Sequence, residues 1–165
     1  MPDFWMDADS FIEPHRGPYR FESIPQFWDF LEAKTREGMI ASPKLVLDKE
    51  LSADPGDEQD VLEKWAKGLR DIMFLDANES VQASYKEVVD YVKNNKRYKN
   101  HWIAKFLDGA DPWLIAYAKA LGGRIVTRET PQPEAKKPKI PDVARHFGIQ
   151  CINVYNMLAE LGFKV

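Results

Sequence analysis

Residues 4–10 read Phe-Trp-Met-Asp-Ala-Asp-Ser, an apolar run that stops at two closely spaced acids. Such a run predicts a short buried strand over residues 4–6 with an acidic tip. Further strands are predicted at residues 124–127, after a pair of glycines, and at residues 150–152. Segments with helical periodicity separate these strands. This alternation favours an α/β fold with a central, mostly parallel sheet.

Helices are expected to dominate the middle of the chain. The predicted helices cover residues 25–38, 57–70, 81–92, 102–106, 113–121, 142–147 and 154–161, with a short broken helix within 10–19 and, within 40–51, a short helical piece that follows Pro43 and carries Glu50. With 165 residues and 44% hydrophobic content, the chain can bury one core and is too short for two ordinary domains. We therefore expect a single domain over residues 1–165.

The residue types restrict any metal site to oxygen ligands. Cys151 is the only cysteine, which excludes an internal disulfide and an all-cysteine zinc site. The three histidines, His15, His101 and His146, are scattered along the chain rather than set at ligand spacing. A metal ion would have to be bound by carboxylates.

Net charge and hydropathy indicate which partners and which cellular location to expect. The formal net charge is −3, from 23 Lys+Arg and 26 Asp+Glu, which argues against a general nucleic-acid coat protein but permits a locally basic face. We find no apolar run long enough to cross a bilayer and no basic-then-apolar leader at the start of the sequence. We therefore expect a cytoplasmic protein without a membrane partner.

Several acids are predicted at the carboxyl ends of the strands, which is the edge where open parallel sheets bind ligands. Asp7 and Asp9 follow the first strand, and Glu129 follows the strand at 124–127. Glu50 and Asp111 stand at or near helix starts, where the chain returns toward the same edge. Clustered carboxylates repel one another, so a fold that gathers them favours a hard cation such as Mg²⁺. Such an ion can hold a phosphate and activate water, which is the chemistry of phosphodiester hydrolysis.

The same segments resemble the motifs of PIN domains. Residues 4–12 resemble the first motif, in which an apolar strand ends in Asp-Thr-Asn or a close variant, and residues 46–51 resemble the segment that brings the second acid. Residues 111–118 are similar to the third motif, an aspartate that opens a helix, and residues 123–129 resemble the strand that carries the last Thr-x-Asp motif. The order of the motifs covers nearly the whole chain.

The resemblance implies a three-layer α/β/α domain with Mg²⁺- or Mn²⁺-dependent endoribonuclease activity. Many small members of the family are toxins of bacterial type II toxin–antitoxin pairs, so it also implies a cognate antitoxin. Carried over by position, Asp7, Glu50 and Asp111 would be the principal catalytic acids, and Glu129 the fourth. Glu129 replaces the usual aspartate of the last motif.

Two further acids enter the predicted metal site. Asp9 stands where asparagine is common in the first motif, and Asp142 competes with Glu129 for the place of the fourth acid. The predicted ligands of the ion are Asp7, Asp111 and Glu129, with Asp9 and Asp142 as further candidates. One ion and two ions are both compatible with these acids.

Five side chains are predicted to contact an RNA substrate: Thr127, Ser10, Arg16, Lys96 and Arg97. The two hydroxyls could bind a metal-bound water or a phosphate, and the basic residues could bind the RNA backbone. Residues 93–102 interleave basic and aromatic side chains, a composition suited to phosphate contact and base stacking, although a solvated helix end commonly looks the same. The lysines of residues 136–139 are a second choice.

Two other functions remain open. A PIN-like domain can keep the fold and only bind RNA or a protein. Haloacid-dehalogenase-like phosphatases also open with Asp-x-Asp after a strand, but the later acidic pair that they need is missing from residues 127–129. The chain has five tryptophans, so one or two are expected in a pocket or an interface, of a homodimer or with an antitoxin, unless all lie in the core.

Overall fold

A computed structural model describes residues 2–51 and 57–165, without the side chains of residues 57–60. The strands are β1 (Phe4–Met6), β2 (Ile40–Pro43), β3 (Phe74–Leu75), β4 (Arg124–Val126) and β5 (Cys151–Ile152). They form one five-stranded sheet in the order β3-β2-β1-β4-β5, and every pair of neighbours is parallel. This confirms the predicted α/β fold with a parallel sheet.

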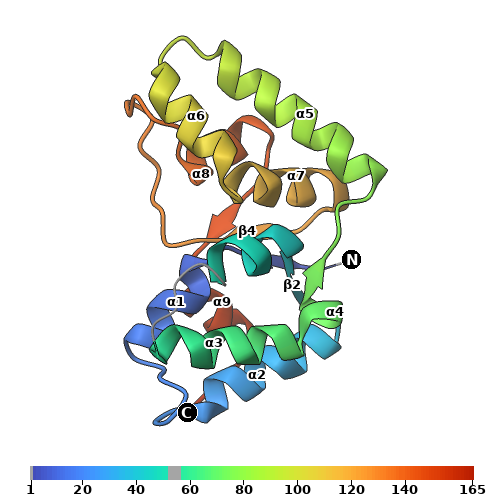
Figure 1. Cartoon of the computed structure of the whole chain (residues 1–165), viewed down its shortest axis with the longest axis vertical. Helices are drawn as coiled ribbons and strands as arrows, with labels where there is room; N and C mark the ends of the chain where they lie inside the picture. Colours follow the sequence, from blue (N-terminus) through green and yellow to red (C-terminus); the bar gives the residue numbers. More distant parts are fainter. Residues whose placement is uncertain (1, 52–56) are drawn as a thin grey trace.

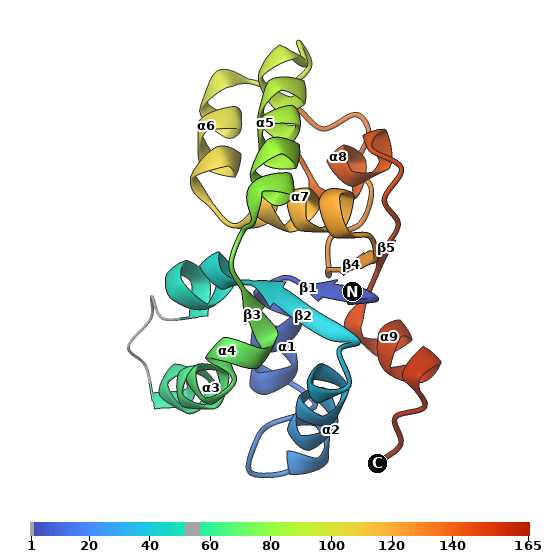
Figure 2. The same ribbon diagram turned by 90° about the vertical axis from the view of Figure 1, so that its right-hand side faces the viewer.

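Helices cover both faces of the sheet (Figures 1 and 2). The lower layer contains α1 (Asp9–Arg16), α2 (Pro25–Arg36), α3 (Asp57–Gly68), α4 (Arg70–Met73) and α9 (Val154–Leu161). The upper layer contains α5 (Glu79–Asn94), α6 (Asn100–Asp108), α7 (Asp111–Leu121) and α8 (Ile140–His146). A π-helix, η1 (Val46–Leu51), follows β2. The expected three layers are therefore present.

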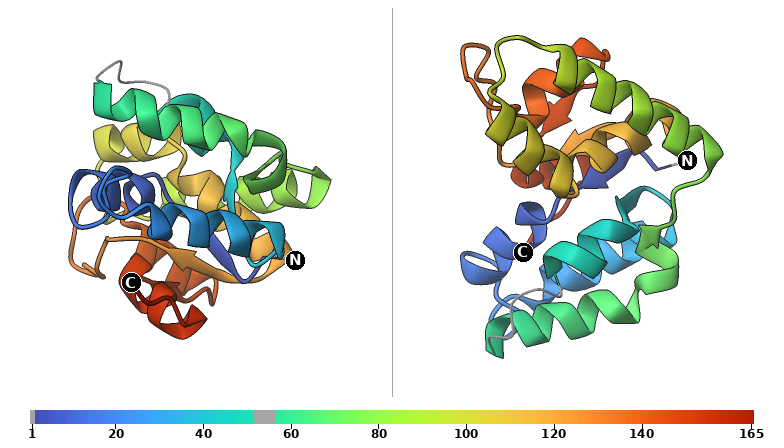
Figure 3. Two further views of the ribbon diagram at one scale, coloured as in Figure 1. Left: turned by 90° about the horizontal axis from the view of Figure 1, so that it is seen from below. Right: turned by 45° about the horizontal axis from the view of Figure 1, so that its top comes forward.

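The two faces of the sheet build two apolar clusters because successive strand side chains point to opposite faces. Phe4 and Met6 of β1 belong to the cluster of the lower layer. Trp5 lies between them in sequence, is 0% exposed, and belongs to the cluster of the upper layer. Seen from below, the lower layer runs from α3 across α1 and α2 to α9 (Figure 3, left). Covering both faces leaves the carboxyl edge of the sheet as the place for a site.

The sequence prediction missed β2 and β3. The helical piece expected after Pro43 is present as η1, but the residues before it, 40–43, form a strand that was not predicted. Ser42 and Pro43 are poor strand formers, and β3 has only two residues. These strands depend on tertiary pairing, and the Ser42 hydroxyl donates to the carbonyl of Met6 at 2.7 Å.

The order of the strands creates a switch point between β1 and β4. After β1 the chain enters α1 in the lower layer, and after β4 it leads to α8 in the upper layer. A crevice forms outside the carboxyl ends of two such strands, and this is where open α/β sheets bind ligands. Among the described residues, we find no helix with the length and apolar character needed to cross a membrane.

Candidate active site

Asp7 is fixed at the switch point by the pairing of β1 with β4. The register places Met6 beside Val126, and the backbone N–H of Asp7 donates to the carbonyl of Val126 at 3.1 Å. The Asp7 carboxylate then accepts the backbone N–H of Ser10 at 2.9 Å and the Ser10 hydroxyl at 2.6 Å. The buried Thr127 hydroxyl donates to the same carboxylate. The hydroxyls of Ser10 and Thr127, predicted to contact substrate, thus hold Asp7 in place.

Burial decides the proton affinity of Asp7. The residue is 6% exposed, and its pKa is raised from 3.8 to about 6, with desolvation as the largest cause. The hydrogen bonds from Ser10 and Thr127 lower this pKa without cancelling the effect of burial, and the charge of Asp9 contributes to the rise. Asp7 is therefore a carboxylate whose negative charge the fold leaves uncompensated.

Burial and the negative charges of the other acids raise the pKa of Asp111. Asp111 opens α7, and its pKa is raised from 3.8 to about 7, with burial as the largest cause. The charges of Glu129, Asp7, Glu50 and Asp9 contribute the rest of this rise, in that order of size. These acids come from the ends of β1 and β4 and from η1. The structure thus brings together acids that are spread along the chain from residue 7 to residue 129, as the sequence predicted.

The π-helix delivers Glu50 to the same place. One carboxylate oxygen of Glu50 accepts the backbone N–H of Ala110, the residue before Asp111, at 3.3 Å. The neighbouring Lys49 forms an ion pair with Asp108 at 3.3 Å. Both contacts dock η1 onto the junction of α6 and α7. A π-helix is rare and often marks a functional site, which fits the role of η1 as the carrier of an acid.

Glu129, rather than Asp142, faces the other acids. Glu129 accepts the backbone N–H of Ile140, in the first turn of α8, at 2.9 Å, and its carboxylate lies 3.8 Å from the ammonium of Lys139. The carboxylate of Asp142 instead accepts the backbone N–H of Gln132 at 2.8 Å. Asp142 therefore holds the loop before α8.

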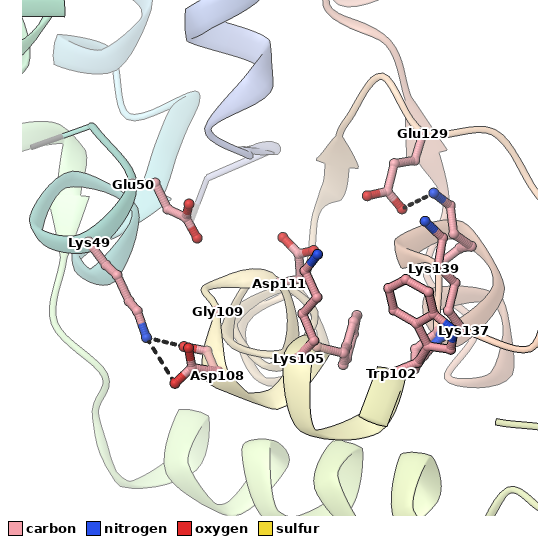
Figure 4. Close-up of a pocket in the computed structure, with 12 residues that line it drawn as sticks. Lys49, Glu50, Trp102, Lys105, Asp108, Gly109, Asp111, Glu129, Lys137 and Lys139 are labelled. Carbon is pink, nitrogen blue, oxygen red and sulfur yellow. Dashed lines mark hydrogen bonds and ion pairs between the residues drawn. The ribbon is translucent and has the colours of Figure 1, made fainter. Parts of the chain in front are cut away.

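A cleft of about 410 Å³ opens between η1, α6, α7 and the loop after β4. Figure 4 shows the carboxylates of Glu50, Asp111 and Glu129 directed toward one another across this space. The remaining lining is mostly basic, aromatic or small, with one further acid that is paired with Lys49: Lys49, Trp102, Lys105, Phe106, Asp108, Gly109, Lys137, Pro138 and Lys139. The cleft thus combines acids with lysines.

The donor set of the cleft fits a hard divalent cation. All its candidate ligands are carboxylates, and burial and mutual repulsion raise the pKa of both Asp7 and Asp111. Within residues 2–51 and 57–165, no three His, Cys, Asp or Glu side chains are already arranged as a metal-binding group. Glu50 and Glu129 are instead held by backbone N–H groups, so an ion would have to draw these two flexible side chains inward.

The basic residues predicted first, Arg16, Lys96 and Arg97, lie outside the cleft lining, whereas two of the second choice, Lys137 and Lys139, line it. Arg16 lies in the last turn of α1. Lys96 and Arg97 precede α6, and the Arg97 guanidinium donates to the carbonyl of Pro133. Two lysines that line the cleft, Lys49 and Lys105, were not predicted from the sequence. Lys49 adjoins Glu50, and Lys105 lies one helical turn after Trp102.

Comparison with known proteins places the chain in a family. The model of the family described as "Domain of unknown function (DUF4411)" matches residues 4–165. No curated protein and no solved structure matches the chain. The matched region includes β1, β4 and all the acids of the cleft. The chain therefore belongs to the DUF4411 family.

Proposed function

We propose that the protein is a metal-dependent ribonuclease that acts in the cytoplasm. The observation that supports this most is the convergence of Glu50, Asp111 and Glu129 on one cleft, with Asp7 close enough to raise the pKa of Asp111. Gathering uncompensated carboxylates destabilises a fold, so their presence favours a bound cation. The resemblance of the same segments to PIN-domain motifs supports the same activity.

Asp7 and Asp111 would hold the ion. Asp7 directly follows β1 and Asp111 is the first residue of α7, so the fold fixes the position of both carboxylates. Glu50 and Glu129 would complete its ligands. When bound, a divalent ion activates water and offsets charge on a phosphate. Ser10 and Thr127 orient the Asp7 carboxylate, and their hydrogen bonds lower its pKa and so favour the charged form that binds a cation.

The lysines make the acidic cleft accessible to a polyanion. Acids alone repel RNA, but four lysines line the same cleft. Their ammonium groups raise the local concentration of a negatively charged substrate and bind phosphates beside the acids. A cleft with acids among lysines therefore fits phosphodiester cleavage better than it fits binding of a small acid.

Cleavage of a mixed pool of structured and single-stranded RNAs tests the proposal. The native protein is expected to cut in Mg²⁺ or Mn²⁺ and not in EDTA. Asp7→Asn and Asp111→Asn are expected to lose the activity, and Asp29→Asn, an exposed acid on α2, serves as the matched control. Cleavage that survives both site variants, or a native protein that binds RNA without cutting it, would count against the proposal.

A chemical test separates the nuclease from a phosphatase of the haloacid-dehalogenase kind. That chemistry passes through a covalent phosphate on the first aspartate, Asp7, whereas direct attack by water leaves no covalent adduct. Mass spectrometry after incubation with a phosphate ester and rapid denaturation distinguishes the two. A phosphorylated Asp7 would replace the nuclease proposal with a phosphatase.

The resemblance also extends the proposal to the toxin of a type II toxin–antitoxin pair. Expression of a ribonuclease toxin arrests bacterial growth until the antitoxin is present. We expect native protein, but not Asp111→Asn, to arrest growth when expressed alone. Growth that is equal for the two proteins would remove the toxin role while leaving the nuclease proposal open to the cleavage assay.

A further inference from the structure

Trp102 is a tryptophan that the hydrophobic core does not use. Trp28 belongs to the apolar cluster of the lower layer and Trp5 to that of the upper layer, and Trp65 and Trp113 pack against these clusters. Trp102 belongs to neither cluster, and its half-buried ring lines the acidic cleft. A large aromatic surface in a cleft, outside the core, points to a ligand that covers it.

Two lysines flank this ring. The Lys105 ammonium lies over the Trp102 ring at 5.5 Å from its centroid, and the Lys137 ammonium lies over the ring at 5.1 Å. Neither lysine forms an ion pair with another residue of the described part of the chain, whereas the other two lysines of the cleft pair with acids. The tryptophan and both lysines line the same cleft as Asp111 and Glu129 (Figure 4). Both ammonium groups thus pack on the indole and neither is held by an acid of the described residues, so a base that takes their place on the ring would leave both for its phosphates.

The arrangement is built by contacts between α6 and the loop before α8. The backbone N–H of Lys99, at the N-terminus of α6, donates to the carbonyl of Lys136 at 2.9 Å. The Arg97 guanidinium donates to the carbonyl of Pro133 in the same loop. These bonds hold Lys137 beside α6 although the two segments are far apart in sequence. The fold therefore places the three side chains together through backbone contacts of their neighbours.

We propose that Trp102, Lys105 and Lys137 form a subsite for one nucleotide of single-stranded RNA. The base would stack on the indole, and the two ammonium groups would bind the phosphates on either side of that nucleotide. A base within a duplex is already stacked and paired, so this subsite selects unpaired RNA. The inference rests on the proposed function and deepens it, because it states which form of RNA reaches the acids.

The test measures binding of the full chain to RNA in EDTA, where metal-dependent cleavage does not occur. Fluorescence anisotropy compares a short labelled single strand of mixed sequence with the same strand in a duplex. Trp102→Leu is expected to weaken binding of the single strand by about tenfold, which is typical for the loss of one base–aromatic stack, and Trp102→Phe to restore most of it. The duplex is expected to bind more weakly and to be insensitive to both changes.

The lysines are tested through the salt dependence of the same binding. Lys105→Gln and Lys137→Gln are each expected to lower the slope of log affinity against log salt by about 0.7, the value for one phosphate contact on a single strand. Lys34→Gln, on α2, is the control and should leave the slope unchanged. Equal binding by native protein and Trp102→Leu, equal binding of single strand and duplex, or no binding of the single strand would each overturn the subsite.

Cleavage in Mg²⁺ then separates this inference from the function on which it rests. A subsite for binding predicts that Trp102→Leu raises KM and leaves kcat close to native. If single strands bind through Trp102 but are never cut, the nuclease proposal fails and the subsite stands. If RNA is cut and Trp102→Leu changes neither binding nor KM, the nuclease stands and the subsite fails.

Discussion

Neutralising Asp111 is expected to change how the stability of the metal-free protein depends on pH. The pKa of Asp111 is raised from 3.8 to about 7, so the folded protein holds this proton more tightly than the unfolded chain does. The stabilisation from that proton is fully present below pH 3.8 and is lost as the pH rises through about 7. The native protein should therefore become less stable over this window, and Asp111→Asn should be spared that loss.

The shift of the Asp111 pKa sets the size of the effect. A shift of one pKa unit corresponds to about 1.36 kcal/mol, so the Asp111 proton accounts for about 2.5 kcal/mol of the stability lost between pH 5 and pH 8. Asp7, with a pKa of about 6, contributes to both proteins and largely cancels in the comparison. Asp111→Asn should therefore gain about 2.5 kcal/mol relative to the native protein on going from pH 5 to pH 8.

Urea unfolding in EDTA at pH 5 and pH 8 measures the difference. Glu79→Gln is the matched control, because Glu79 is an exposed acid in the first turn of α5. This control also loses a favourable interaction between an acid and a helix N-terminus, but it removes no buried charge. Native and Asp111→Asn stabilities that change in parallel with pH, or an equal effect of Glu79→Gln, would refute the argument that Asp111 carries a buried, uncompensated charge.

Three further predictions concern the same acids. Mg²⁺ should raise the Tm of the native protein more at pH 8 than at pH 5, because protons compete for Asp111, and calorimetry should show no such gain for Asp111→Asn. Ser10→Ala removes a hydrogen bond that lowers the pKa of Asp7, so the acidic limb of the pH–rate profile for RNA cleavage should move to higher pH; an unmoved limb would argue against this link. Glu129→Gln keeps a side-chain oxygen that can accept the backbone N–H of Ile140, so it should reduce kcat at unchanged stability. Asp142→Asn should lower the Tm by a few degrees and keep kcat. The opposite pattern would make Asp142 the fourth acid.

The central strands and the principal acids could be predicted because their signals are local. The apolar run before Asp7 and the strand after Gly123 each pair a buried strand with an acid at its end. Asp111 opens a strongly apolar helix that a pair of glycines ends. Gly123 has a φ of 96°, and a Cβ at this position would lie 2.7 Å from the carbonyl oxygen of Pro2, so the glycine allows the connection between α7 and β4 to lie close to the chain just before β1. These features are visible in a single sequence.

The direction of side chains could not be predicted in the same way. Spacing along the chain favoured Glu129 as the fourth acid but left Asp142 as a competing candidate, because both follow β4. Only the folded chain shows that the backbone N–H of Ile140 binds one of them and that of Gln132 binds the other. The same limit explains Lys49 and Lys105, which look like ordinary surface lysines until η1 and α6 are placed side by side.

The helix-rich middle acquires a specific role once the cleft is known. The segment between β3 and β4 is longer than a connection across the sheet requires, and α6 in particular leads into another helix, α7, rather than into a strand. It supplies Trp102 and Lys105 to the cleft, and its N-terminal end holds the loop that carries Lys137. The acids come from the strand ends and from the helices that pack on the sheet, whereas the RNA-binding wall that we propose comes from the added helix. A DUF4411 protein that keeps the acids but changes α6 should therefore retain the chemistry and differ in the RNA that it accepts.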